Sequence, residues 1–455
     1  MQTRLSRSNS DESITWDAKS KENAHASRLS PFDVLMLLDE RPGYPMCFFI
    51  ETHLSGDLSL QRLRTAIENA AQRHPRLRSC AQYSTHGWQW SLSNQPPQIV
   101  QLEHTPNKES QAIAFRPFNI RREPGIRFIV IPESNQQWSI ILQVHHSVCD
   151  GLSALDFLGD IWSLYHGSQP TDFQTHSRTN NIQTHLENDG NQNIKGDHQH
   201  TNQTIAFATF RPSSITSLNN AKNIPHGRKP FQSFTLPATT VKSLRKRASH
   251  SGATTNDIIV AASFLAIHKW NSRQGKAGKR IRITMPVNLR PPRERQPASN
   301  QIGYAFLDRL PSQLRDPPEV IKSIAEASRW IQHSGAAGMF LVVLGVFLKR
   351  TWLLRLITQI PACFSTAVVS NLGNIQSRMR AKVPKADGCD KPEGLIITNV
   401  SAVPPVRPGT ALSMCITAYC GQLTVTTMTD SSQLTPSDSM ELTNLLQSQI
   451  EHLAL

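Results

Sequence analysis

A polar tract in the middle of the chain limits how this protein can fold. Residues 168–205 are dense in Asn, Gln, His, Thr and Asp and hold few apolar positions. Such a segment buries too little apolar surface to offset the conformational entropy lost on ordering, so we expect a disordered linker or insertion there. It separates two segments, 29–167 and 206–455, which we expect to form two halves of the fold.

The N-terminus has a similar polar character. Residues 1–28 are rich in Ser, Asn, Lys and Glu and lack the apolar core of a signal peptide, so we expect a disordered leader. The chain has seven cysteines, an odd number, and no CxxC pair. This pattern argues against a zinc site and a disulfide scaffold, and it favours a reducing, cytoplasmic location.

The chain is strongly basic, with a net charge of +14 and a sequence pI near 9.7. A nucleic acid, an anionic membrane, or an acidic small molecule or protein would each suit such a surface. The basic residues form short clusters at 242–247, 273–282 and 290–295, and no nucleic-acid-binding module surrounds them. We therefore expect no specific nucleic-acid partner.

Hydrophobic periodicity predicts a mixture of strands and helices in both segments, and hence an α/β fold. Neither segment contains a glycine-rich phosphate loop or a GxSxG nucleophile elbow. The strands are expected at 47–54, 76–83, 88–92, 128–132, 138–144, 231–236, 280–287, 366–370, 394–400, 411–419 and 422–429, and the helices at 58–73, 152–167, 241–248, 255–270 and 435–453.

Residues 339–348 are wholly apolar and are followed by Lys349 and Arg350. No run of about 20 uncharged apolar residues occurs anywhere, so no spanning helix is expected. The default interpretation of 339–348 is a buried helix. The alternative is a helix that touches lipid or lines an apolar channel.

A pair of histidines follows the predicted strand 138–144. Alternate residues of that strand are apolar, and His146 continues the same face, whereas His145 points the other way. The positions after Gly151 have helical spacing and end near Gly167. The histidines therefore lie at a junction between two rigid elements, which is a good place for a reactive side chain.

The chemistry of this junction has several interpretations. A neutral imidazole, with an ordinary pKa of about 6.5, can take a proton from a hydroxyl or an amine. Asp150 could orient an imidazole or brace the turn by pairing with a distant arginine, and Gly151 allows backbone geometry that a side chain would obstruct. A plain turn after a strand is an equal alternative on spacing alone. Metal ligation lacks a third ligand at suitable spacing.

The run His145-His146-Ser147-Val148-Cys149-Asp150-Gly151 resembles the HHxxxDG signature of the acyltransferase superfamily with the chloramphenicol-acetyltransferase-like fold. This superfamily includes peptide-synthetase condensation domains, wax ester synthase/diacylglycerol acyltransferases, alcohol acetyltransferases, polyketide-associated acyltransferases and the plant BAHD enzymes. The resemblance extends from about Pro31 to the C-terminus. Residues 285–290, 300–304 and 370–373 are similar to the family's strand ending in Asn/Asp-x-Arg, its Gly/Asn segment and its Ser-Asn segment.

The resemblance implies a two-layer α/β architecture of two similar halves, with the active site at their interface and a tunnel from each face. It implies transfer of an acyl group from a CoA or carrier-protein thioester, as cosubstrate, to a hydroxyl or amine acceptor. No covalent intermediate and no permanently bound cofactor or metal are expected. His146 would be the general base, with His145 structural, and Asp150 would brace the site through an ion pair with Arg290.

The resemblance also assigns further site residues and partners. Gly151 would keep the pantetheine channel open, and Ser370 and Asn371 are candidates for oxyanion or substrate contacts. The expected partners are a small-molecule or lipid acceptor and an acidic acyl carrier protein. Peripheral contact with a membrane is also expected. We expect the protein to be a monomer. The plant-type signature DFGWG is absent. The alternative is a non-catalytic ligand- or carrier-binding protein of the same fold.

Overall fold

The computed structural model describes residues 27–85, 87–173, 212, 214–215, 231–276, 279–291, 294–348, 355, 363–380 and 394–455. The expected linker at 168–205 lies outside these residues except for 168–173, and the expected leader lies outside them except for its last two residues. Those two, Ser27 and Arg28, form strand β1 and pair with Trp90 and Gln89. Ser27 and Arg28 are therefore ordered, although they lie within the expected leader, because strand β4 supplies their backbone hydrogen-bond partners.

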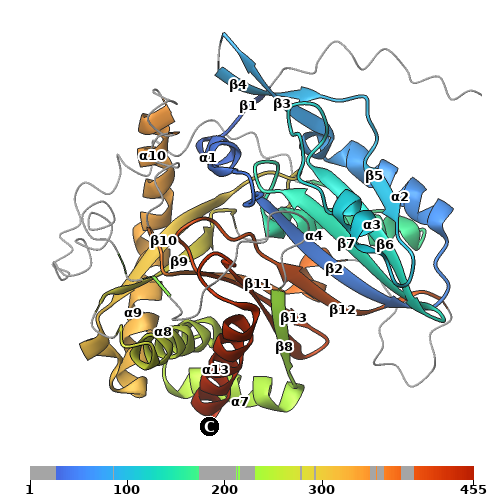
Figure 1. The fold of residues 1–455 in the computed structure, drawn as a ribbon. Helices are drawn as coiled ribbons and strands as arrows, with labels where there is room; N and C mark the ends of the chain where they lie inside the picture. Colours follow the sequence, from blue (N-terminus) through green and yellow to red (C-terminus); the bar gives the residue numbers. More distant parts are fainter. Residues whose placement is uncertain are drawn as a thin grey trace, which may run out of the picture.

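Four strands of the N-terminal segment and β12 (Ile396–Val403) form a five-stranded sheet of order β12-β2-β7-β6-β5, and three further strands form a small sheet of order β1-β4-β3 (Figure 1). Helices α2 and α4 pack together in the apolar core beneath the larger sheet. The elements are β1 (Ser27–Arg28), α1 (Pro31–Asp39), β2 (Cys47–Ser55), α2 (Leu60–Arg73), the 3₁₀ helix η2 (Pro75–Arg78), β3 (Ser79–Ser84), β4 (Gly87–Leu92), β5 (Gln98–Gln101), α3 (Lys108–Ala114), β6 (Ile126–Ser134), β7 (Gln137–His145) and α4 (Gly151–Tyr165).

The C-terminal segment builds a six-stranded sheet of order β10-β9-β11-β13-β14-β8, and helices α7, α8, α9 and α13 share its core. Figure 1 shows α7, α8 and α13 grouped at the side of this sheet. The elements are β8 (Phe231–Leu236), α7 (Ala238–His250), α8 (Thr255–Arg273), β9 (Ile281–Asn288), β10 (Ile302–Arg309), η3 (Pro311–Leu314), α9 (Pro317–Ser334), α10 (Ala336–Leu348), β11 (Ala367–Asn374), α12 (Ile375–Met379), β12 (Ile396–Val403), β13 (Leu412–Tyr419), β14 (Gln422–Thr429) and α13 (Pro436–Ala454).

Strand β12 corrects the expected division into two consecutive halves. It belongs to the C-terminal segment, yet it pairs antiparallel with β2 at the edge of the N-terminal sheet. Its Ile397, Val400 and Ala402 are buried in the N-terminal core. An unpaired edge strand exposes its backbone N–H and C=O groups, and β12 satisfies those of β2. The C-terminal segment therefore contributes one strand to the N-terminal sheet.

Most expected elements are confirmed. Helix α2 begins after Ser59, whose hydroxyl accepts from the Arg62 N–H, and it ends before Pro75 as the proline rule predicts. The strand expected from residue 76 begins at Ser79 instead, because Pro75–Arg78 form a 3₁₀ turn. Helices α1, α3, α9 and α12 and strands β5 and β10 were not predicted from the sequence.

The default prediction of a buried helix at 339–348 is wrong. Helix α10 packs one side on α1 and β10, and only Ala337 and Leu344 in it are buried. The most exposed large side chains on its other side are Met339 (51%), Val342 (50%), Val343 (50%) and Val346 (62%). In the part of the chain that the structure describes, no single helix has the length and hydropathy to cross a bilayer. Helices α9 and α10 meet these criteria only together, with a 60° bend between them.

Candidate active site

The paired histidines lie between strand β7 and helix α4. Strand β7 ends at His145, and the backbone N–H of His146 donates to the Met46 carbonyl (2.7 Å), which extends the pairing with the β2 side of the sheet by one residue. Asp150 caps α4 by accepting from the Ser153 N–H (3.0 Å). Hydrogen bonds therefore fix the chain on both sides of His146, as the sequence predicts.

His145 points away from the cavity and is fully buried. Its Nδ1 accepts from the Ser147 backbone N–H (3.2 Å) and lies 2.7 Å from the Ser147 hydroxyl, while its Nε2 lies 3.1 Å from Glu40 Oε2. Because Nδ1 accepts from an N–H group, the ring proton must be on Nε2 and donates to Glu40. These contacts of His145 hold the turn, and its structural role at the site stays a prediction.

His146 faces the cavity. Its ring contacts those of Phe48 and Phe32, with centroids 5.2 and 5.8 Å away. Desolvation by these surroundings lowers the pKa of His146 below its ordinary value. Its Nδ1 is buried and has no hydrogen-bond partner among the described residues. The imidazole is therefore held neutral at neutral pH and can accept a proton.

The cavity lies between the two halves. It encloses about 990 Å³ of space, including open solvent at its mouth. Most of its lining is apolar, and its residues come from both segments of the chain. They are Met46, Phe48, His146, Asp150, Gly151, Leu152, Pro286, Asn288, Ile302, Tyr304, Val368, Ser370, Asn371, Leu372, Ala402, Val403, Pro404, Pro405, Arg407, Ser413 and Cys415.

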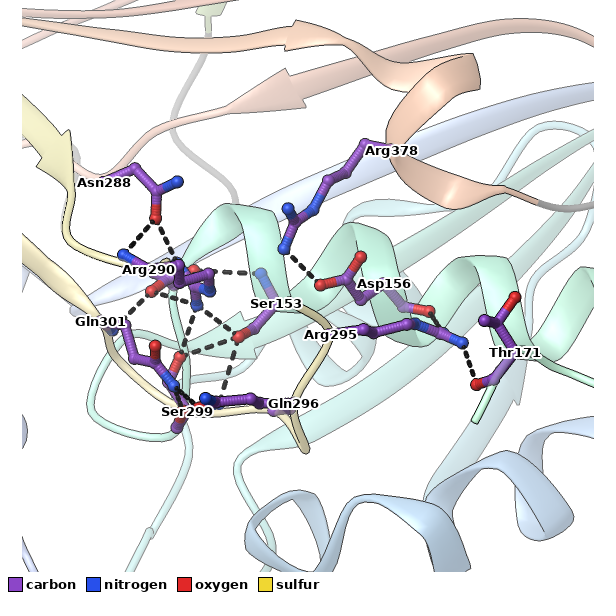
Figure 2. Close-up of polar contacts among 12 residues, drawn as sticks. Ser153, Asp156, Thr171, Asn288, Arg290, Arg295, Gln296, Ser299, Gln301 and Arg378 are labelled. Carbon is purple, nitrogen blue, oxygen red and sulfur yellow. Dashed lines mark hydrogen bonds and ion pairs between the residues drawn. The ribbon is translucent and has the colours of Figure 1, made fainter. Parts of the chain in front are cut away.

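Asp150 is held by an arginine, as expected. Arg290 Nη2 lies 2.8 and 2.7 Å from the two oxygens of Asp150, and the Gln301 backbone N–H donates to the same carboxylate (2.8 Å). Figure 2 shows Arg290 and Gln301 close to Ser153 of α4. Both charged side chains are almost fully buried. Among the described residues, Asp150 makes no hydrogen bond to His146. Its contacts thus brace the loop at 290–301 against α4.

Two further aspartates of α4 pair with arginines of the C-terminal segment. Figure 2 shows Asp156 bonded to Arg378 of α12, and Asp160 pairs with Arg295. Arg295 also donates to the Thr171 carbonyl (2.8 Å). These two pairs were missed from the sequence. The signal for them was the presence of acidic residues in an otherwise apolar helix, because a buried carboxylate needs a cation.

Gly151 lies close to Leu372 of the other half and needs no special backbone conformation. It begins α4 and is not among the glycines with positive φ, so the predicted backbone role is wrong. A Cβ atom at this position would lie 2.8 Å from Leu372 Cδ2. Leu372 belongs to β11 in the other half and lines the cavity. A Cβ at position 151 would require the end of the Leu372 side chain to shift. The predicted role of Gly151 in a pantetheine channel stays a prediction.

Ser370 and Asn371 both reach the cavity, but their side chains differ. Ser370 lies opposite Cys415 in the register of the neighbouring strand. Asn371 is already engaged, because its Nδ2 donates to Asn256 Oδ1 (3.0 Å) and its Oδ1 accepts from the Gly373 N–H (2.8 Å). Burial raises the pKa of Cys415 to about 12, so this thiol stays protonated. Of the two candidates, Ser370 has the more available donor.

Comparison with known proteins agrees with this geometry. The condensation-domain family model matches residues 37–318, which is more than half of the chain. The chain belongs to the condensation-domain family. The first condensation domain of the calcium-dependent antibiotic synthetase, solved with a substrate analogue, superposes with a TM-score of 0.66 at 15% identity, over 95% of this chain and 96% of that domain.

Two relatives come from Mycobacterium tuberculosis. An uncharacterised protein is 23% identical over 369 residues, covering 76% of this chain and 83% of the relative. A protein provisionally assigned as a diacylglycerol O-acyltransferase is 23% identical over 219 residues, covering 44% of this chain and 42% of the relative. The resemblance to the condensation and acyltransferase superfamily, and the chloramphenicol-acetyltransferase-like fold that it implies, are thus confirmed.

Proposed function

We propose that this member of the condensation-domain family is an acyltransferase that uses His146 as a general base. The donor would be a CoA or carrier-protein thioester, and the acceptor a hydroxyl or an amine. One observation carries the proposal. The His146 imidazole, which makes no hydrogen bond to Asp150 among the described residues and whose pKa is lowered by burial, faces a largely apolar cavity between the two halves.

The reaction follows from this placement. His146 takes the proton of the acceptor O–H or N–H while the acceptor atom attacks the thioester carbonyl carbon. The resulting oxyanion would accept a hydrogen bond from the Ser370 hydroxyl. When the tetrahedral intermediate collapses, the C–S bond breaks and the departing thiolate takes the proton from the imidazolium. The protonated thiol of Cys415 does not compete as a nucleophile, so no acyl-enzyme is needed.

Substrate turnover tests the proposal directly. The full chain would be incubated with acyl-CoAs of increasing chain length and with alcohol, amine or diacylglycerol acceptors, and free thiol and acylated product would be measured. We expect thiol release that depends on the acceptor. The apolar lining predicts a gain of up to about fourfold per added methylene in kcat/KM, until the chain fills the cavity. Tight acyl-CoA binding without product from any acceptor would instead identify a non-catalytic binding protein.

A lipid acceptor is favoured by helix α10. Figure 1 shows α10 beside α1 at the margin of the molecule, and four of its large apolar side chains are at least half exposed. On its packed side, the Phe340 ring lies 5.1 Å from Tyr304, which lines the cavity. A lipid that partitions into a bilayer touching α10 would therefore be delivered near the site.

Vesicle binding tests this contact. We expect the chain to float with vesicles that contain anionic phospholipid. The paired change Val343→Glu and Val346→Glu should weaken that binding by about tenfold or more, because two exposed valines that would enter the bilayer are replaced by charges. Met440→Glu is the matched control, since Met440 is equally exposed (52%) on the distant helix α13. Equal flotation of all three proteins would exclude α10 as the contact.

A further inference from the structure

A single guanidinium group lines the largely apolar cavity that His146 faces. Among the lining residues in the described part of the chain, Arg407 is the only lysine or arginine. Its Nε lies 3.0 Å from Asp39 Oδ2, and its Nη2 donates to Asp39 Oδ1 (3.0 Å), at the end of α1. Two contacts to one carboxylate fix the plane of a guanidinium. Arg407 is therefore held in position before any ligand binds.

The contacts with Asp39 leave one nitrogen of Arg407 unused. Nε is buried, Nη2 donates to Asp39, and Nη1 has no hydrogen-bond partner among the described residues. The whole side chain is only 26% exposed. The two N–H groups of Nη1 therefore need an acceptor from outside the protein, which is water or a bound molecule.

The charge of Arg407 is incompletely compensated by its partner. Arg41 Nη2 also lies 3.9 Å from Asp39 Oδ1, so one carboxylate serves two guanidinium groups. Arg41 Nε and Nη2 are buried and have no hydrogen-bond partner in the parts of the chain that the structure describes. Cations removed from water are stabilised by a nearby anion. The surroundings of Asp39 thus favour an anionic ligand over a neutral one.

Tyr304 offers a second donor in the same cavity. It lines the cavity, and its hydroxyl makes no hydrogen bond to any described residue. Burial raises the pKa of Tyr304, so the phenol keeps its proton and can donate it. Arg407 and Asp39 both act on the charge of this phenol, which places it within electrostatic range of the ion pair.

The Phe32 side chain lies between these donors and the histidine. Its ring centroid lies 5.8 Å from that of His146 and 5.3 Å from that of Tyr304. A substrate whose reacting atom is at His146 would reach Tyr304 with a part that is several bonds away. The donors therefore suit a group that is recognised, not the group that reacts.

We propose that Arg407 and Tyr304 form a subsite for a carboxylate carried by a substrate. One carboxylate oxygen would accept from Arg407 Nη1 and the other from the Tyr304 hydroxyl. A planar monoanion matches these two donors, whereas a phosphate dianion would find no second cation among the described lining residues. The subsite rests on the proposed function only for whether the acyl donor or the acceptor carries the carboxylate. Its ligand is tested without turnover.

Isothermal titration calorimetry of the full chain compares three ligands with the same apolar tail, namely octanoate, octanamide and octyl phosphate. We expect octanoate to bind about tenfold or more tighter than octanamide, because hydrogen bonds to a charged group are stronger than those to a neutral one. Octyl phosphate should bind no more tightly than octanoate. Equal binding of octanoate and octanamide, or tighter binding of octyl phosphate, would overturn the proposal.

Two variants connect this preference to the subsite. Arg407→Gln leaves Asp39 with Arg41 as its remaining cation, and we expect it to abolish the preference for octanoate while the affinity for octanamide stays. Tyr304→Phe should weaken octanoate binding by about threefold or more, through loss of one donor. Thermal unfolding shows whether each variant is folded. A preference for octanoate that survives in both variants would contradict the subsite.

Arg116→Gln is the matched control. Arg116 also holds a carboxylate through two contacts, both 2.6 Å, and that residue, Glu123, keeps Arg127 (3.5 Å) as its remaining cation. Neither Arg116 nor Glu123 lines the cavity. The preference for octanoate should therefore be unchanged in this variant. A loss as large as that in Arg407→Gln would show that the preference does not come from the subsite.

Turnover identifies the substrate that carries the carboxylate. Adipoyl-CoA is compared with hexanoyl-CoA as donor, and ω-hydroxyhexanoate with its amide as acceptor. We expect the carboxylate to raise kcat/KM by about tenfold or more in one of the two pairs, and Arg407→Gln to remove the difference. No difference in either pair would overturn the assignment to a substrate. If no thioester is turned over at all, the proposed function fails, while calorimetry still decides the subsite.

Discussion

His146→Ala is expected to lower kcat/KM for acyl transfer by about 10²- to 10⁴-fold, the usual contribution of a general base. The fold should survive, because the His146 backbone N–H keeps its bond to the Met46 carbonyl, and Nδ1 of the removed ring has no hydrogen-bond partner among the described residues. Thiol release measures the activity, and circular dichroism with thermal unfolding measures the fold.

A second histidine provides the control for this variant. His268 on α8 is also partly buried, and desolvation lowers its pKa too, but it does not line the cavity. His268→Ala should keep wild-type turnover. Full acyl-transfer activity in His146→Ala would remove the base from the mechanism and would leave the family fold without the proposed chemistry.

Arg290→Ala is expected to destabilise the protein by about 3–5 kcal/mol, the cost of leaving a buried charge without its partner. The Asp150 carboxylate would keep only the Gln301 and Ser153 N–H donors in a place that is almost fully buried. Urea unfolding measures the change in free energy. Activity should also fall, because the pair fixes the turn that carries His146.

A double-mutant cycle separates the ion pair from other losses. Removing Asp150 as well eliminates the unpaired charge, so the double variant should be less destabilised than the sum of the two single variants. The exposed pair of Arg273 and Glu441 is the matched control, and Arg273→Ala should cost about 1 kcal/mol or less. A loss in Arg290→Ala no larger than in Arg273→Ala would contradict a structural brace.

Local patterns in the sequence predicted much of the fold and part of the site. Alternation predicted strand β7, the direction of His145 and the junction at His146, because side-chain direction in a strand follows from the backbone itself. The partnership of Asp150 with Arg290 came from the family resemblance, and the structure confirms the ion pair. Helix α9 could also have been found, since its buried residues Val320, Ile321 and Ile324 have helical spacing.

Other features depend on which segments meet in space. The exposure of α10 was missed because a wholly apolar run does not say whether a neighbour covers it. The place of β12 depends on the free edge of β2, some 350 residues away.

The sequence by itself thus determined most of the local elements, the HHxxxDG run and the family resemblance. Only the tertiary structure decided the surroundings of His146: the cavity between the halves, the carboxylate bound by Arg290, and the pairing of Arg407 with Asp39. The physical reason is that hydrogen bonding and desolvation act over a few ångströms, whereas Asp39, His146 and Arg407 are more than a hundred residues apart along the chain.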